Sequence, residues 1–182
     1  MGELPAGDWV VDCARSRVGF SLKHMLMSTV RGSFHDFAGT LSLSDGAAQA
    51  QGSVEVASLD TGERVRDEHV LNSADFFDLA SHPQIGFRST RVELDRRRLK
   101  VIGPLSIRGN SHEIQLEGQI ERVAPEPGAA GMRAEISLRG EIERSDFGLV
   151  WNQALDTGGL LLGSKVKIAL EIVAVNATAS GA

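Results

Sequence analysis

The stretch MRAEISLRGEIE, residues 132–143, alternates apolar with charged or hydroxyl side chains over most of its length. Its apolar members share one parity, at Met132, Ala134, Ile136, Leu138 and Ile142. Side chains two positions apart in a β-strand point to the same face, so one face of this segment is dry and the other is wet. The pattern indicates an antiparallel sheet, because strands buried in parallel sheets are apolar on both faces.

The same alternation recurs along most of the chain. It is found within residues 18–24, 41–44, 53–56, 99–107, 112–121 and 165–172. An open antiparallel sheet of eight or more strands tends to curl or split, and closure removes its exposed edges. We therefore predict an all-β fold built on an eight-stranded antiparallel barrel, which either is filled by side chains or holds one small ligand. A two-sheet sandwich is the alternative.

One long stretch, residues 61–82, lacks the alternation. It predicts a short helical excursion near residues 63–80, stopped by Pro83. The strands on both sides of it are of one kind, so we expect a single domain over residues 1–176. Residues 177–182 are small and polar and are expected to form a flexible tail.

Two local features qualify the strand pattern in the second half of the chain. The apolar parity changes between Phe87 and Val92, which predicts a bulge near residues 89–90. Pro104 lies inside an alternating segment. Proline cannot donate a hydrogen bond to a neighbouring strand, so we expect that strand at an edge or a bulge.

Charge and composition argue against several classes of protein. The net charge is −5, so the chain lacks the basic surface that nucleic acid attracts. Cys13 is the only cysteine, which excludes an intrachain disulfide and a cysteine metal site. No stretch approaches the roughly 20 apolar residues of a membrane span. The first residues lack the pattern of a signal peptide, so we expect a cytoplasmic protein. A homodimer is left open.

Motifs for catalysis are also missing. The sequence has no Gly-x-Ser-x-Gly elbow, no phosphate-binding loop and no dinucleotide fingerprint. We therefore predict no enzyme, no catalytic residue, no cofactor and no metal. One alternative is a metal-assisted enzyme, because His24, His69 and His112 could meet in space although their spacing is not that of a metal site.

The predicted inward face is almost wholly apolar. The residues that we expect to line the interior are Phe20, Leu22, Phe34, Val54, Val56, Phe76, Phe87, Leu105, Ile107, Ile114, Leu116, Ile136, Leu138, Ile168 and Leu170. They could form a packed core, which would suit a scaffold domain. The chain has no Tyr and only two Trp, however, so few large rings are available to plug a barrel.

Several short motifs, taken in order, resemble those of the YceI-like, polyisoprenoid-binding family from Trp9 to about Ala174. They are WVVD (9–12), SRVGF (16–20), VRGSF (30–34), DFFD (75–78), GPLSIRG (103–109) and RSDFGL (144–149). The resemblance implies an extended lipocalin-like barrel. It also implies a carrier or sequestering protein that holds a long isoprenoid lipid, a polyprenyl chain or an isoprenoid quinone, in an apolar tunnel. Many members of that family resemble exported proteins, and this sequence departs from them in showing no signal.

A lipid in such a tunnel would bring its head group to polar side chains at one end. His24 continues the inward row of its strand, and Arg66, Asp67 and His69 lie in the helical excursion. We expect these four to contact the head group or to brace the loop. Arg144 and Asp146 are interpreted as a brace at a strand end.

Overall fold

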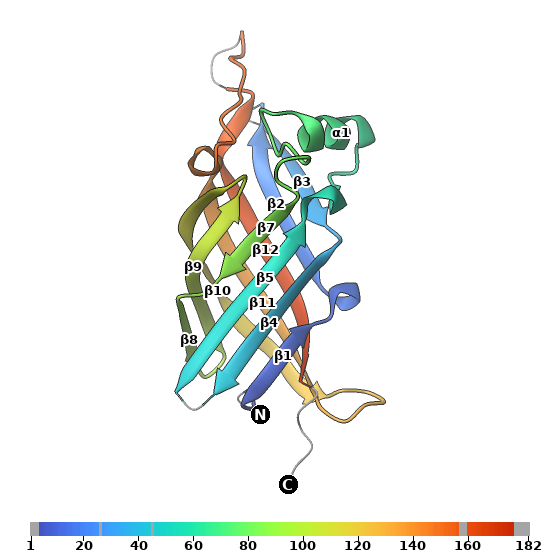
Figure 1. The fold of residues 1–182 in the computed structure, drawn as a ribbon, viewed down its shortest axis with the longest axis vertical. Helices are drawn as coiled ribbons and strands as arrows, with labels where there is room; N and C mark the ends of the chain where they lie inside the picture. Colours follow the sequence, from blue (N-terminus) through green and yellow to red (C-terminus); the bar gives the residue numbers. More distant parts are fainter. Residues whose placement is uncertain (1–3, 26, 45, 157–159, 177–182) are drawn as a thin grey trace.

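The computed structural model describes residues 4–25, 27–44, 46–156 and 160–176 (Figure 1). The expected flexible tail, residues 177–182, lies outside the described residues. The strands are β1 (Gly7–Val11), β2 (Arg17–His24), β3 (Ser28–Phe34), β4 (Phe37–Ser44), β5 (Ala47–Glu55), β6 (Leu59–Asp60), β7 (Gln84–Arg88), β8 (Arg91–Asp95), β9 (Arg98–Ile107), β10 (Asn110–Pro125), β11 (Met132–Glu143) and β12 (Leu162–Asn176). The helices are α1 (Arg64–Asn72) and the short 3₁₀ turns η1 (Cys13–Arg15), η2 (Val56–Ser58) and η3 (Arg144–Phe147).

Eight of these strands form a closed antiparallel ring in the order β1-β4-β5-β7-β9-β10-β11-β12. The ring closes where β12 returns to β1, with Val10 opposite Val175 and Val11 opposite Ala174. Further along the same edge of β12, β2 takes the place of β1 and continues the wall into β3 and β6. The predicted all-β, eight-stranded antiparallel barrel is confirmed, and the two-sheet sandwich is not formed.

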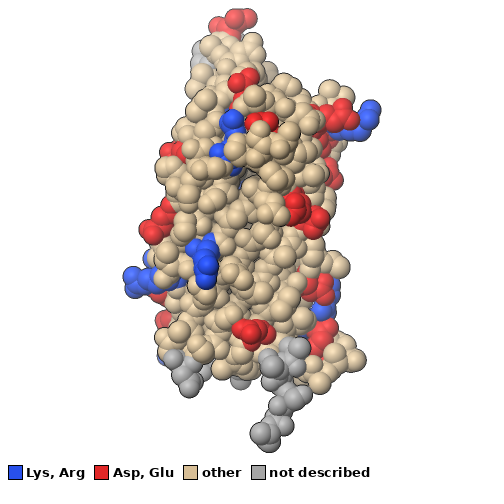
Figure 2. Space-filling model, viewed as in Figure 1, with Lys and Arg blue, Asp and Glu red and all other residues tan. Residues whose placement is uncertain are grey.

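The burial of the strands follows their alternation. Along β9, every second residue from Leu99 to Ile107 is buried and the residues between them are half-exposed. β11 repeats the pattern, with Ala134, Ile136, Leu138 and Ile142 buried. On the face shown in Figure 2, acidic and basic side chains are scattered over broad uncharged areas. The dry face therefore points into the barrel and the wet face points to solvent.

The helical excursion lies over one end of the barrel (Figure 1). The side chain of Glu63 caps α1 by accepting hydrogen bonds from the backbone N–H groups of Val65 and Arg66. The helix ends at Asn72, and residues 73–82 form hydrogen-bonded turns, so the predicted excursion near residues 63–80 consists of one short helix followed by turns. α1 has nine residues, and none of the helices among the described residues is long and apolar enough to cross a membrane.

The bulge expected near residues 89–90 is instead a break between two strands. β7 ends at Arg88 and β8 begins at Arg91, and both pair with β9. Pro104 lies where that edge of β9 passes from β8 to β7. A residue without an N–H group is tolerated there because the ladder is already interrupted.

Gly103 is required by this break. A Cβ atom at position 103 would lie 2.2 Å from the carbonyl oxygen of Arg88, whereas a Cβ atom at Gly86 would meet open space. We predict that Gly103→Ala lowers the free energy of unfolding by about 1–3 kcal/mol, because the backbone of β9 must move. Gly86→Ala is the matched control, with an expected change within about 0.5 kcal/mol. Urea unfolding measures both, and equal effects would contradict the close approach.

Candidate functional site

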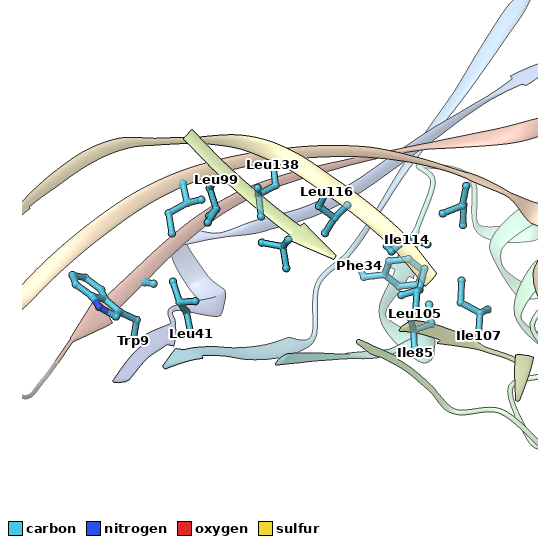
Figure 3. Packing of buried hydrophobic residues seen from close by; sticks show 14 of the residues in the cluster. Trp9, Phe34, Leu41, Ile85, Leu99, Leu105, Ile107, Ile114, Leu116 and Leu138 are labelled. Carbon is cyan, nitrogen blue, oxygen red and sulfur yellow. The ribbon is translucent and has the colours of Figure 1, made fainter. Parts of the chain in front are cut away.

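The barrel encloses a cavity of about 510 Å³. Ligand pockets in proteins have volumes of roughly 300–1,000 Å³, so the volume of this cavity lies within the range of ligand-binding pockets. The row of buried apolar residues beside it runs from Trp9 and Leu41 at one end to Ile107 at the other (Figure 3). The side chains therefore line the interior without filling it.

The exposure of inward side chains on two strands also indicates the cavity. Phe20 and Leu22 on β2 and Ile168 and Leu170 on β12 point inward, yet they are only half-buried. An inward side chain stays accessible when the space before it is empty. The inner wall of the barrel thus has apolar surface that the other described side chains do not cover.

Most of the predicted lining residues border this cavity. They are Phe20, Leu22, Phe34, Val54, Phe76, Phe87, Leu105, Ile107, Ile114, Leu116, Ile136, Leu138, Ile168 and Leu170. Val56, which was also expected to line the interior, is buried but is not among the residues that border the cavity. The reason is local: β5 ends at Glu55, and the chain turns there into η2, so the parity of the strand does not continue to Val56.

The side chains of Arg66 and Asp67 both form hydrogen bonds with Thr61. The Arg66 guanidinium donates to the Thr61 hydroxyl at 2.8 Å and to the Thr61 carbonyl at 2.9 Å. The Asp67 carboxylate accepts from the Thr61 hydroxyl and from its backbone N–H. Arg66 borders the cavity and Asp67 does not. Asp67 therefore braces the loop, whereas Arg66 both braces it and faces the interior.

The three histidines considered for a metal cluster are not brought together. His24 and His69 border the cavity, and the ring of His112 packs on Phe147 at 5.4 Å. Within the described ranges, no three His, Cys, Asp or Glu side chains are grouped so that they could hold a metal ion. The three-histidine site is therefore not formed by these residues.

Arg144 is the wall residue that the sequence analysis missed as a site residue. It is only 6% exposed and borders the cavity. Its guanidinium donates to the carbonyl of Gly163 at 3.0 Å, to that of Trp151 at 2.9 Å and to that of Leu149. Burial lowers the pKa of this guanidinium. Arg144 follows the end of β11 and begins η3, so the parity of the strand does not fix its direction, as at Val56.

Aromatic contacts join the helical excursion to the segment that follows β11. The ring of Phe76 lies 5.7 Å from that of His69 and 5.4 Å from that of Trp151. On the other side of the excursion, Phe77 packs edge-on against Phe34 at 6.2 Å. These rings cover the α1 end of the cavity, so that end has both polar groups and large aromatic surfaces.

A family model described as the YceI-like domain matches residues 9–174. The chain belongs to the YceI-like family. This confirms the family resemblance seen in the sequence. A UPF0312 protein of Staphylococcus aureus strain N315 is 31% identical over 163 residues, which cover 88% of this chain and 92% of that protein.

Solved structures of the YceI-like fold superpose on nearly the whole barrel. Burkholderia cenocepacia BcnA matches with a TM-score of 0.73 and 25% identity, over 90% of this chain and 98% of that one. A Campylobacter jejuni YceI protein matches with a TM-score of 0.71 and 27% identity, over 97% and 99%. A polyisoprenoid binding domain from Saccharophagus degradans, at 17% identity, shares the fold with a TM-score of 0.68, over 93% and 98%.

Proposed function

We propose that this YceI-like protein is a non-catalytic carrier that sequesters one long isoprenoid lipid, a polyprenyl chain or an isoprenoid quinone, inside its barrel. The observation that carries the proposal is the cavity of about 510 Å³ with an almost wholly apolar wall. Such a wall offers little to a polar substrate. The same fold in Saccharophagus degradans belongs to a polyisoprenoid binding domain, which supports this class of ligand.

The energetics of an apolar chain fit such a cavity. Burying one five-carbon isoprene unit is worth roughly 4 kcal/mol as an upper figure. A few units therefore supply a high affinity, even after the cost of ordering the chain. Recognition of the lipid chain depends on the length of the cavity and on the absence of water from it rather than on polar contacts. The half-buried inward residues of β2 and β12 provide the surface against which it would pack.

The direct test is to identify what the protein carries. We expect that protein purified from cells and extracted with organic solvent yields a prenyl lipid at near-stoichiometric amount by mass spectrometry. Stripped protein should take up an added prenyl lipid of matched length. Extracts without such a lipid, together with no uptake of any prenyl lipid by the stripped protein, would overturn the proposal.

A further inference from the structure

The ionisable residues on the cavity wall are all of basic types, and the two arginines among them carry positive charge. They are His24, Arg66, His69 and Arg144, and the described wall contains no Asp or Glu. The whole chain has a net charge of −5, so this local excess of basic groups does not follow from composition. An interior of one sign attracts the opposite sign.

All four basic residues lie at the α1 end of the barrel. Arg66 and His69 belong to α1, and His24 ends β2 opposite Leu162 of β12. Arg144 donates to the carbonyl of Gly163, next to Leu162 along β12. The ring of Phe76 contacts the rings of His69 and Trp151, and the backbone carbonyl of Trp151 accepts a hydrogen bond from Arg144. The wall is therefore apolar along its length and basic at one end.

The charge of Arg144 lacks a counter-ion. No ion pair joins it to a carboxylate among the described residues, and its bonds go to carbonyl oxygens from Nε and Nη1. Its Nη2 group takes part in none of these hydrogen bonds, and it is not among the fully buried atoms without a partner in the described structure, so it reaches accessible space. A guanidinium buried in this way is costly unless an anion compensates it.

Arg66, which is half-buried, also has an unused donor. The carboxylate next to it, that of Asp67, is taken up by Thr61 and makes no ion pair with Arg66 in the described structure. The guanidinium of Arg66 uses Nε and Nη2 for Thr61, which leaves Nη1 without a described partner. Two arginines at the same end of the cavity thus each keep a donor and a charge available.

We infer that the head group of the bound lipid is an oxyanion, such as the phosphate of a polyprenyl phosphate, and that Arg144 and Arg66 receive it. The inference rests on the proposed function and names the chemistry of its ligand. Guanidinium groups hold phosphate oxygens through charge-assisted hydrogen bonds, which are about twice as strong as neutral ones. An alcohol or a quinone carbonyl would occupy the same place without neutralising either charge.

The test compares ligands that differ only in the head group. Geranylgeranyl phosphate and geranylgeraniol are titrated into stripped protein below their aggregation concentrations. We expect the phosphate to bind at least about tenfold more tightly than the alcohol. Equal affinities would overturn the inference and leave the proposed function standing. Binding of neither lipid would instead count against the proposed function.

Two variants on α1 locate the effect. Arg66→Gln should reduce the ratio of phosphate affinity to geranylgeraniol affinity by at least about threefold, whatever its effect on the alcohol alone. Arg64→Gln is the matched control, because the side chain of Arg64 is 86% exposed and pairs with Glu68 outside the cavity. A preference that survives Arg66→Gln in full, or that falls equally in both variants, would overturn the role of Arg66.

Arg144→Gln tests the second arginine. Where circular dichroism shows the variant folded, it should lose the preference for phosphate more completely than Arg66→Gln does, since Arg144 is the more buried charge. A folded Arg144→Gln variant that retains the full preference would overturn its role. Because Arg144 also holds three carbonyls, the variant can fail to fold, and the Arg66 and Arg64 pair then decides the inference.

Discussion

Replacing Ala50 with tryptophan is expected to weaken binding of a prenyl lipid by about a thousandfold without unfolding the barrel. Ala50 lies on β5 opposite Leu41, borders the cavity and is half-buried. An indole at this position would take up the room of roughly one isoprene unit. Excluding five buried carbons forfeits about 4 kcal/mol, which corresponds to about three orders of magnitude in affinity.

The adjacent residue supplies the control. Gln49 is exposed on the outer face of the same strand, so Gln49→Trp introduces the same side chain outside the barrel. Calorimetric titration of stripped protein with one prenyl lipid should show wild-type affinity for Gln49→Trp and little binding for Ala50→Trp. Undiminished binding by Ala50→Trp would mean that the lipid sits elsewhere. A loss of about 1–3 kcal/mol in its stability would mean that the interior was already packed.

The barrel could be predicted because its sheet has one dry face. In such a sheet every strand carries its orientation in the alternation of its own residues, as in residues 132–143. Closure also followed from the sequence, since many strands of one kind leave few other ways to cover the edges. The closing pair of β1 with β12 joins residues more than 160 positions apart, and their register was beyond sequence reasoning.

The errors lie where a strand stops. Counting parity assumes that the backbone stays extended, and Val56 was placed on the wall because nothing in its sequence marks the turn that begins there. The break after Arg88 was taken for a bulge for the same reason. Both are decided by tertiary contacts: the backbone N–H of Val56 donates to the carbonyl of Pro83, and that of Ser89 donates to the carbonyl of Ala50.

Arg144 shows the limit for site residues. It lies just beyond the end of β11, where strand parity gives no direction, and a buried arginine needs acceptors that sequence alone does not reveal. The structure provides three carbonyls, from Leu149, Trp151 and Gly163, and the last of these lies 19 residues away. Arg66 and His69 were found because the helical excursion was suspected of meeting the barrel. Polar residues of a site can thus be predicted from sequence, whereas their burial is known only from the structure.

Trp9→Ala is expected to lower the free energy of unfolding by about 3–5 kcal/mol, the usual cost of removing a large buried ring. Trp9 has no exposed surface, and its indole N–H donates to the carbonyl of Pro5 at 3.0 Å. It lies on β1, the strand that closes the ring between β4 and β12, at the end of the cavity away from α1. Its loss would therefore weaken closure as well as packing.

Val10→Ala is the control for that variant, since Val10 is the next residue on β1, points outward and is 51% exposed. We expect it to change the stability by no more than about 0.5 kcal/mol. Urea unfolding of stripped protein followed by circular dichroism measures both variants, so that bound lipid does not mask the difference. A loss below about 1 kcal/mol for Trp9→Ala would show that β1 is not needed to seal the barrel. In that case the affinity of Ala50→Trp would have to be reconsidered too, because the wall that confines the lipid would not depend on β1 at the end away from α1.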